Sequence, residues 1–503
     1  MPIDPRTPVI VGVAQRTQNR AALPGPEPLE AWESCCRLAL EDAGLPASAL
    51  GNTDFLALGN CMSWNYDDPA GRLAERLSIM PRHVLNGSAS GASGHQMLHA
   101  AADAIRAGGA DMAIICGGES LASLKRYKAA GESPPWSHPA PPGSEQNFDR
   151  RRLPAEVAAG MADGVGVVYG FAMRDIARRA HLGIDPQVYR AEMGELEAGM
   201  TRVASTNPDA WFRTAREPDF LIEPRADNRM ISYPYTKHMV AIIDVDIAGA
   251  LILMSTAEAD RLGVAQDRRV YPWNGCYSED GGYAIMQPHL WRSEAMNAAS
   301  QAVLGAAGVT IDEVRHVDVY TCFPAAINFA RDALGAHDRG GDRLTVTGGL
   351  PYGGGPASCY VITSLIKMTE RLRSDPGSVG LVSGLGKSQM IHHAFGLYST
   401  RPPQEQGVRQ VDEKAVQAGL RQVPLVALVD DYAGPASIAA YTILYDRQGE
   451  ISHGVAMCDL QGGGRSYARI SSRDLLREGE VSELVGRRVT ISPGEALGEL
   501  HAS

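Results

Sequence analysis

The sequence predicts an α/β protein made of two similar α/β halves followed by an all-β module. Strands alternate with helices along most of the chain, which is typical of a largely parallel sheet covered on both faces. The same series of elements returns about 265 residues further on, which indicates a duplicated unit. After Pro403 the pattern changes to short strands joined by tight turns, which favours a separate β module.

The first half begins with a short apolar run at residues 8–14, which predicts a buried strand. Residues 29–45 have apolar side chains at helical spacing and an Ala-Gly stop signal, and therefore predict a helix. A strand is expected at 54–60, a helix at 96–107, and a strand at 111–120 that runs into a glycine turn.

The second half repeats this order. A helix with a glycine stop is expected at 293–309 and a strand at 316–323. A glycine-rich turn at 348–356 then precedes a helix at 359–373 and a second apolar strand at 379–386. The matching order supports one core built from two similar halves.

We expect three units along the chain. The first half covers residues 1–255 and includes a long insertion at 121–235, which is either a lid or binding segment or a surface excursion without a ligand. The second half covers residues 256–403. Residues 404–503 form a β-rich module, for which we expect a small OB-like barrel.

The composition is that of a globular protein. The 503 residues are 44% apolar and 21% charged, which excludes a chain disordered over its length. A net charge of −11 without a long basic run argues against nucleic acid as a partner. No apolar stretch reaches ~18 residues, so no membrane span is expected, and the beginning does not resemble a signal peptide. Eight cysteines without CxxC spacing predict a reduced, cytoplasmic protein.

Four strings, in this order along the chain, resemble the thiolase superfamily. They are VIVGVAQRT at 9–17, GGADMAIICGGES at 108–120, IIDVDIAGALILMS at 242–255 and GGLPYGGGP at 348–356. The resemblance covers about residues 8–400. It implies a layered αβαβα core with an acyl-CoA pocket at the strand ends, and a ligand that is coenzyme A or an acyl-CoA.

Three further strings resemble the thiolase-like proteins that have an extra C-terminal domain. They are NRMISYPYTKHM at 228–239, VDVYTCFPAA at 317–326 and TVTGGLPYGGGP at 345–356. Some of these proteins are named acetyl-CoA acetyltransferases by family membership, and a name of that kind is not evidence of activity.

Thiolase chemistry needs a nucleophilic cysteine, a histidine, an asparagine-held water and a second cysteine. Aligned without a gap, the nucleophile motif falls on Gly91-Ala92-Ser93-Gly94, so the nucleophile position is Gly91; a gapped alignment offers Ser88 instead. Tyr320 stands at the asparagine position and Gly355 at the histidine position. The second-cysteine motif falls near residues 383–386, where no cysteine is present. The resemblance therefore implies the fold and argues against Claisen chemistry.

Two tyrosines are the main candidates for any remaining chemistry. Tyr320 and Tyr352 lie on turns that line the site in the family, and a tyrosine can donate or accept a proton. Thiolase-like aldolases that work with a barrel-containing partner are thought to use site tyrosines. The alternative is that both rings only fill the space of lost catalytic groups.

Several further residues are weaker candidates. His393, after the last strand, aligns better than His392 with a histidine of the similar proteins and is a candidate acid or base; a histidine paired in a loop is the alternative. His95 and His99 are spaced four apart, but no third metal ligand is evident, so no metal is expected. The cluster Arg150-Arg151-Arg152 either meets CoA phosphates or is a solvated basic cluster.

We therefore expect an acyltransferase-like, acyl-CoA-binding enzyme of lipid metabolism that acts on C–C bonds by aldol-type chemistry. Ser90, Gly91, Gly354 and Gly355 are the expected substrate-binding positions; Ser90 is only a weak candidate nucleophile, because no Gly-x-Ser-x-Gly elbow surrounds it. No covalently bound cofactor is expected, and the protein is either a monomer or a homodimer. The alternative is a non-catalytic acyl-CoA-binding or scaffold protein.

Overall fold

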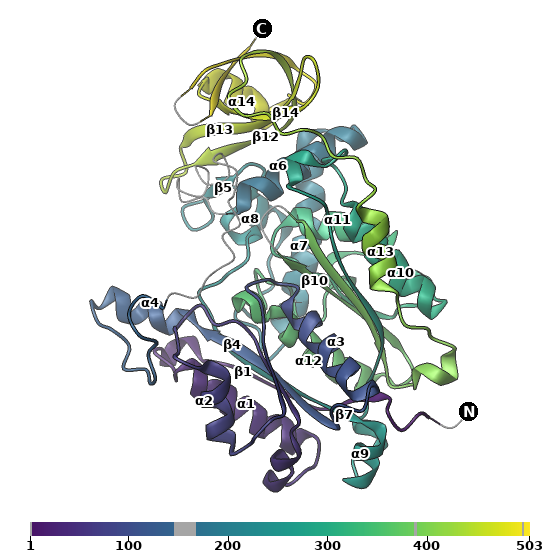
Figure 1. The fold of residues 1–503 in the computed structure, drawn as a ribbon. Coiled ribbons are helices and arrows are strands. Elements are labelled where there is room, and N and C mark those ends of the chain that lie inside the picture. Colours follow the sequence, from purple (N-terminus) through teal and green to yellow (C-terminus); the bar gives the residue numbers. More distant parts are fainter. Residues whose placement is uncertain (1–2, 145–166, 387–389, 495–496, 503) are drawn as a thin grey trace.

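The computed structural model describes residues 3–144, 167–386, 390–494 and 497–502. Two sheets with helices on their faces form the main body, and a small β barrel lies at the far end of the molecule (Figure 1). No helix in the described ranges is long and apolar enough to cross a membrane.

The first sheet has the strand order β1-β7-β4-β2-β3. The two strands β2 and β3 run parallel to β4, whereas β7 is antiparallel to both β4 and β1. The central strands β4 and β7 are buried over their whole length, which explains their continuous apolar sequence. The strands are β1 (Pro8–Thr17), β2 (Phe55–Leu58), β3 (His83–Asn86), β4 (Met112–Ser120) and β7 (Asp246–Ser255).

The second sheet has the order β8-β11-β10-β9 and repeats the pattern of the first. The parallel pair β9 and β10 corresponds to β2 and β4, and the antiparallel strands β11 and β8 correspond to β7 and β1. The predicted duplication of an α/β half is therefore confirmed. The strands are β8 (Tyr271–Glu279), β9 (His316–Asp318), β10 (Val379–Gly386) and β11 (His392–Ser399).

Two helices form a central layer between the sheets. Both α3 (Ser93–Arg106) and α12 (Tyr360–Ser374) contact strands of each sheet, and α12 is buried along most of its length (Figure 1). They pack closely because Gly94 has no side chain: a Cβ there would lie 2.7 Å from Cβ of Val361. The outer faces are covered by α1 (Pro28–Asp42) and α10 (Glu294–Ala307). The predicted αβαβα layering is confirmed.

The described part of the segment between β4 and β7 is largely helical. Its helices α6 and α7 pack on the second half, against α11 and the 3-10 helix η7 (Gly341–Arg343). Its elements are α4 (Leu121–Ala129), α6 (Val168–Leu182), α7 (Pro186–Thr206), α8 (Pro218–Ile222), β5 (Met230–Ser232) and β6 (Tyr235–Thr236). Further helices of the body are α2 (Pro69–Leu77), α9 (Thr256–Arg261) and α11 (Pro324–Leu334).

The C-terminal region contains a closed five-stranded barrel, in the order β12-β13-β14-β16-β15, with β15 pairing back to β12. This confirms the predicted extra β module. Leu444 of β12 also pairs with Ser232 of β5, so the insertion adds a hairpin to the barrel edge. The helix α13 (Glu413–Leu420) packs on α10 and β8 of the body. The other elements are β12 (Gly434–Tyr445), β13 (Ile451–Leu460), β14 (Arg465–Ile470), α14 (Arg473–Val481), β15 (Arg488–Ser492) and β16 (Gly498–Ala502).

Candidate functional site

Gly91 lies in the turn that leads into α3, where the resemblance places the nucleophile. A Cβ atom added at Gly91 would come well inside 3.0 Å of both the Leu385 carbonyl oxygen and the Tyr320 hydroxyl oxygen, a separation that real Cβ atoms do not show. It would also lie 2.6 Å from Cζ of Tyr320. The end of β10 and the tyrosine ring therefore occupy the space that a side chain at this position needs.

Tyr320 stands two residues beyond the end of β9 and is almost fully buried. Its ring packs edge-on against Tyr360, with 5.4 Å between the centroids. Its backbone N–H donates to the Ser383 hydroxyl at 2.8 Å, which ties the end of β9 to β10. Burial raises the pKa of the phenol, and the nearby Cys322 and Cys359 raise it further. Tyr320 is therefore a neutral hydrogen-bond donor at physiological pH.

Ser90 lies beside Gly91 but has no activating base. Its hydroxyl accepts from the Ala92 N–H at 3.3 Å. In the described parts of the chain, no histidine or carboxylate hydrogen-bonds to it. A Cβ at Gly386 would come inside 3.0 Å of the Ser90 Oγ, so Ser90 faces the glycine-rich end of β10.

The turn at 348–356 brings glycine backbone close to β7 and the residues before it. Gly354 has a φ of 106°, and a Cβ there would lie 2.5 Å from the Ile247 side chain. The Gly355 N–H donates to the Ile242 carbonyl at 2.9 Å. A Cβ at Gly355 would be 3.1 Å from that carbonyl oxygen, so this position is tight even for alanine.

Tyr352, in the same turn, faces α7. Its hydroxyl neighbours the Glu197 carboxyl, although the two groups do not reach hydrogen-bond geometry. Both side chains are buried, and burial raises the pKa of Glu197 to about 8. We find no hydrogen bond or ring contact between Tyr352 and Tyr320 in the described structure. The two predicted tyrosines therefore have different surroundings.

The expectation that His393 follows the last strand is wrong, because it lies on a further strand, β11, and pairs with Leu385 of β10. Its Nε2 is 2.9 Å from the Ser293 hydroxyl and 3.7 Å from the Asp280 carboxylate, and all three groups are buried. Asp280 also accepts from Ser293 and from the Ala295 N–H at the start of α10. Burial alone would raise the pKa of Asp280, but His393, Arg174 and Ser293 together lower it. This cluster holds the beginning of α10.

The remaining predicted candidates are three histidines and an arginine cluster. The rings of His95 and His99 lie 5.7 Å apart, and burial lowers their pKa values to about 3 and about 4. No group of three metal-ligating side chains occurs in the described ranges. His392 is 2.9 Å from the Tyr277 hydroxyl. The arginine cluster at 150–152 lies outside the described residues.

A buried carboxyl near this region was not predicted. Glu119, at the end of β4, accepts hydrogen bonds from the Met62 and Ser63 N–H groups, each at 2.8 Å. Burial raises its pKa to about 7, against the lowering effect of these hydrogen bonds. Cys359 neighbours Glu119 on one side and Tyr320 on the other. In the sequence, the acidic residue after a double glycine in GGES could have indicated a buried carboxyl. Its two N–H partners are 56 and 57 residues away, so the sequence does not show them.

The candidate site therefore combines a filled nucleophile position, a neutral phenol and glycine-rich turns. Burial raises the pKa of both the Cys322 and Cys359 thiols, so neither is a ready thiolate. A neutral phenol of this kind can donate a hydrogen bond to a carbonyl oxygen.

Comparison with known proteins supports the same class of protein. Residues 57–169 match the family described as beta-ketoacyl synthase, N-terminal domain. An acetyl-CoA acetyltransferase of Chromobacterium violaceum is 25% identical over 331 residues, which cover 58% of this chain and 75% of that protein.

Solved structures extend the likeness over the whole chain. A monomeric SCP2-thiolase-like protein type 1 from Mycobacterium smegmatis is 26% identical, with a TM-score of 0.83 and complete coverage of both chains. An acetyl-CoA acetyltransferase from Syntrophomonas wolfei is 16% identical, with a TM-score of 0.55, and covers 80% of this chain and 100% of that one. The Ltp2-ChsH2(DUF35) aldolase has the same identity and coverage, with a TM-score of 0.56. These last two likenesses show the fold alone.

The duplicated sheets, the central helix pair and these similarities define a thiolase-like protein. The chain is similar to thiolase-like proteins, and its likeness to the mycobacterial protein extends over the C-terminal barrel.

Proposed function

We propose that this protein binds an acyl-CoA and acts on it without forming an acyl-enzyme. The observation that carries the proposal is the Gly91 position, where the Tyr320 ring and the Leu385 carbonyl fill the space of a nucleophile. The proposed ligand lies between the Gly91 turn, the 121–235 insertion and the turn at 348–356. Glycines in these turns permit close approach of a ligand to the backbone.

The proposed reaction is aldol-type cleavage or formation of a C–C bond next to the thioester. In cleavage, a base takes the proton of the 3-hydroxyl group and the C2–C3 bond breaks. A carbonyl compound leaves, and the enolate of the shorter acyl-CoA is protonated at C2, so one proton is removed and one is delivered. Tyr320, which burial keeps neutral, donates a hydrogen bond to the thioester oxygen where the negative charge develops.

A non-catalytic acyl-CoA-binding protein is the second candidate. It is favoured by the surroundings of the two tyrosines, because Tyr320 packs on Tyr360 and Tyr352 faces Glu197. In this case both rings fill space, and the protein binds its ligand without turnover.

Release of a carbonyl product from a panel of branched 3-hydroxyacyl-CoAs separates the two candidates. We expect Tyr320→Phe to lower turnover by about 10²- to 10³-fold, the usual cost of removing one hydrogen-bond donor to an oxyanion, and to leave CoA affinity within a few-fold. Tyr352→Phe tests the second tyrosine in the same assay. Tyr441→Phe removes an equally buried hydroxyl in the barrel and is the matched control.

Each outcome has a clear meaning. Thiolysis of acetoacetyl-CoA at a normal rate, or an acetyl group trapped on a cysteine, would refute the proposal as a whole. Tyr320→Phe activity equal to that of the parent would refute the aldol mechanism. Tight CoA binding without turnover of any substrate would favour the binding protein.

A further inference from the structure

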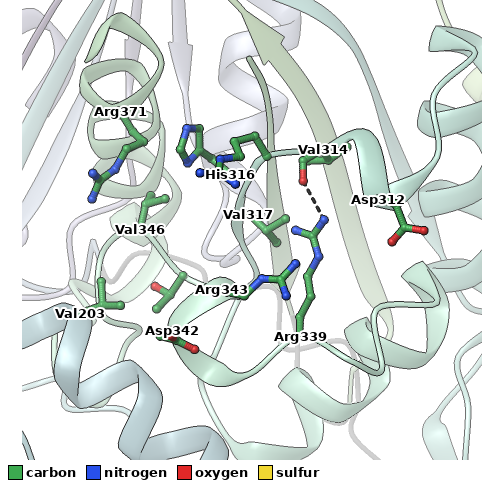
Figure 2. A pocket seen from close by; sticks show the side chains of 12 residues that line it. Val203, Asp312, Val314, His316, Val317, Arg339, Asp342, Arg343, Val346 and Arg371 are labelled. Carbon is green, nitrogen blue, oxygen red and sulfur yellow. Dashed lines mark hydrogen bonds between the residues drawn. The ribbon is translucent and has the colours of Figure 1, made fainter. Parts of the chain in front are cut away.

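A cavity of about 350 Å³ opens at the end of β9 that is opposite to Tyr320 (Figure 2). Its walls come from the start of β9, the loop after α11, η7 and the second half of α12. His316 begins β9, and Tyr320 is four residues further on, which in extended chain is a separation of ~13 Å. The cavity and Tyr320 therefore lie at opposite ends of this strand.

Four arginines line this cavity: Arg315, Arg339, Arg343 and Arg371. None of them has a carboxylate oxygen within 4.0 Å in the described ranges, although the chain has a net charge of −11. Two exposed aspartates, Asp312 and Asp342, also line the cavity, so the formal charge of its wall is positive. Among the described residues, the lining histidine His316 has a carboxylate contact only with Asp375, which is not part of the wall.

Arg339 holds a buried positive charge in this wall. It is 5% exposed, and its guanidinium donates to the Ile311 and Val314 carbonyl oxygens at 2.5 and 2.7 Å. The Arg343 side chain lies next to it (Figure 2). Burial and the charge of Arg343 lower the pKa of Arg339. Asp312 and Asp338 act in the opposite direction, but no carboxylate oxygen lies within 4.0 Å of either guanidinium in the described ranges, so an anion between the two groups would stabilise them further.

Two further arginines of the wall lie near His316. Arg371 extends from α12 toward the cavity, and Arg315 and Arg371 both lower the pKa of His316, whose burial is the largest cause of the shift. Valine side chains, among them Val203, Val317 and Val346, provide apolar surface in the wall. The wall therefore offers forked donors for phosphate oxygens and apolar contact for a carbon skeleton.

We propose that this cavity is a binding site for a small organic phosphate carrying at least two phosphate charges, separate from the acyl-CoA site. Guanidinium groups match phosphate geometry with paired donors, and the cavity volume is within the range of small-molecule sites. Free diphosphate, nucleoside diphosphates and coenzyme A all carry such a diphosphate group. The experiment distinguishes these three ligands. The proposal stands without the proposed reaction.

Isothermal titration calorimetry of the full chain with inorganic pyrophosphate, ADP and inorganic phosphate tests the site. We expect pyrophosphate and ADP to bind at one site, more tightly than phosphate, with and without saturating coenzyme A. Arg343→Gln and Arg371→Gln should each weaken binding by about 10- to 100-fold, the usual cost of a lost hydrogen bond to a charged group. Arg488→Gln, at an exposed arginine on β15, should leave affinity within two-fold.

A thermal-unfolding measurement without any phosphate excludes a purely structural role. Because Arg343 is next to the like-charged Arg339 and has no carboxylate partner, Arg343→Gln should leave the unfolding temperature unchanged or raise it. Three results would overturn the proposal: no binding of pyrophosphate or ADP at millimolar concentration, an equal loss in Arg488→Gln, or a marked loss of stability in phosphate-free Arg343→Gln. Competition by coenzyme A would identify the cavity as part of the CoA site and overturn its separateness.

Discussion

Replacing Gly91 by alanine tests whether the nucleophile position is filled. The added Cβ would lie inside 3.0 Å of a backbone carbonyl oxygen, that of Leu385, and 2.6 Å from Cζ of Tyr320. Overpacking usually costs 1–3 kcal/mol, and here one of the two obstacles is backbone that cannot rotate away. Gly91 does not have a positive φ, so alanine gains about 0.4–1 kcal/mol through the unfolded chain. We expect a net loss of about 2 kcal/mol in the free energy of unfolding.

A double-mutant cycle with Tyr320→Asn measures how much of this loss depends on the ring. The combined variant should be more stable than the sum of the single effects by about 0.5–3 kcal/mol, the usual coupling of residues in contact. Urea unfolding followed by tryptophan fluorescence is suited to this measurement, because all six tryptophans lie outside the barrel strands. They are Trp32, Trp64, Trp136, Trp211, Trp273 and Trp291.

Gly305→Ala is the matched control, because Gly305 lies inside α10 and a Cβ there meets no atom within 4 Å. Alanine should stabilise this helix by about 0.5–1 kcal/mol. A Gly91→Ala variant as stable as the parent would refute the reasoning. So would an absence of coupling to Tyr320→Asn, since the ring would then not occupy the space in question.

Two further predictions concern buried carboxyl groups. The pKa of Glu197 is raised to about 8 in the folded protein from its ordinary 4.5. The contribution of the protonated Glu197 carboxyl to the free energy of unfolding is therefore fully present below pH ~4.5. It is lost as the pH rises through ~8, by about 1.4 kcal/mol per pH unit. In urea unfolding from pH 5 to 8, Glu197→Gln should therefore gain stability relative to the parent, whereas exposed Glu195→Gln on the same helix should not; parallel curves would contradict this. Asp280→Asn should cost about 1.5–3 kcal/mol at pH 7 because it weakens charged hydrogen bonds at the start of α10. Because the pKa of Asp280 is lowered in the folded protein, the stability deficit of Asp280→Asn should shrink as the pH falls below ~3.8. Exposed Asp338→Asn is the control. A deficit no larger than that of the control would contradict the role of Asp280 at the start of α10.

Much of the fold could be predicted because it depends on local periodicity. The apolar run that became β4 and the helical spacing that became α1 are visible within single segments. The repeated order of elements indicated two similar halves, and the change after Pro403 indicated the barrel. The pairing of Ser232 with Leu444 was not predictable, because the strand that contains Ser232 is only three residues long.

The candidate site could be predicted only in part. Residue identity at the motif positions predicts that Gly91, or Ser88 in a gapped alignment, and Gly355 stand where the similar proteins have their cysteine and histidine. It did not show that Tyr352 lies against Glu197, because that contact joins a glycine-rich turn to a helix of the insertion. The pairing of His393 with Asp280 likewise depends on the register between β11 and β8.

By itself, then, the sequence determined the kinds of side chain that are available and the local elements that carry them. Tertiary structure alone decided what those side chains meet: Tyr320 fills the space above Gly91, although the two residues are more than two hundred positions apart. Arg315, Arg339 and Arg371 line one cavity from the residue before β9, from a loop and from a helix. The physical reason is that local periodicity follows from backbone geometry within a few residues, whereas such contacts depend on how sheets and helices far apart in the chain pack together.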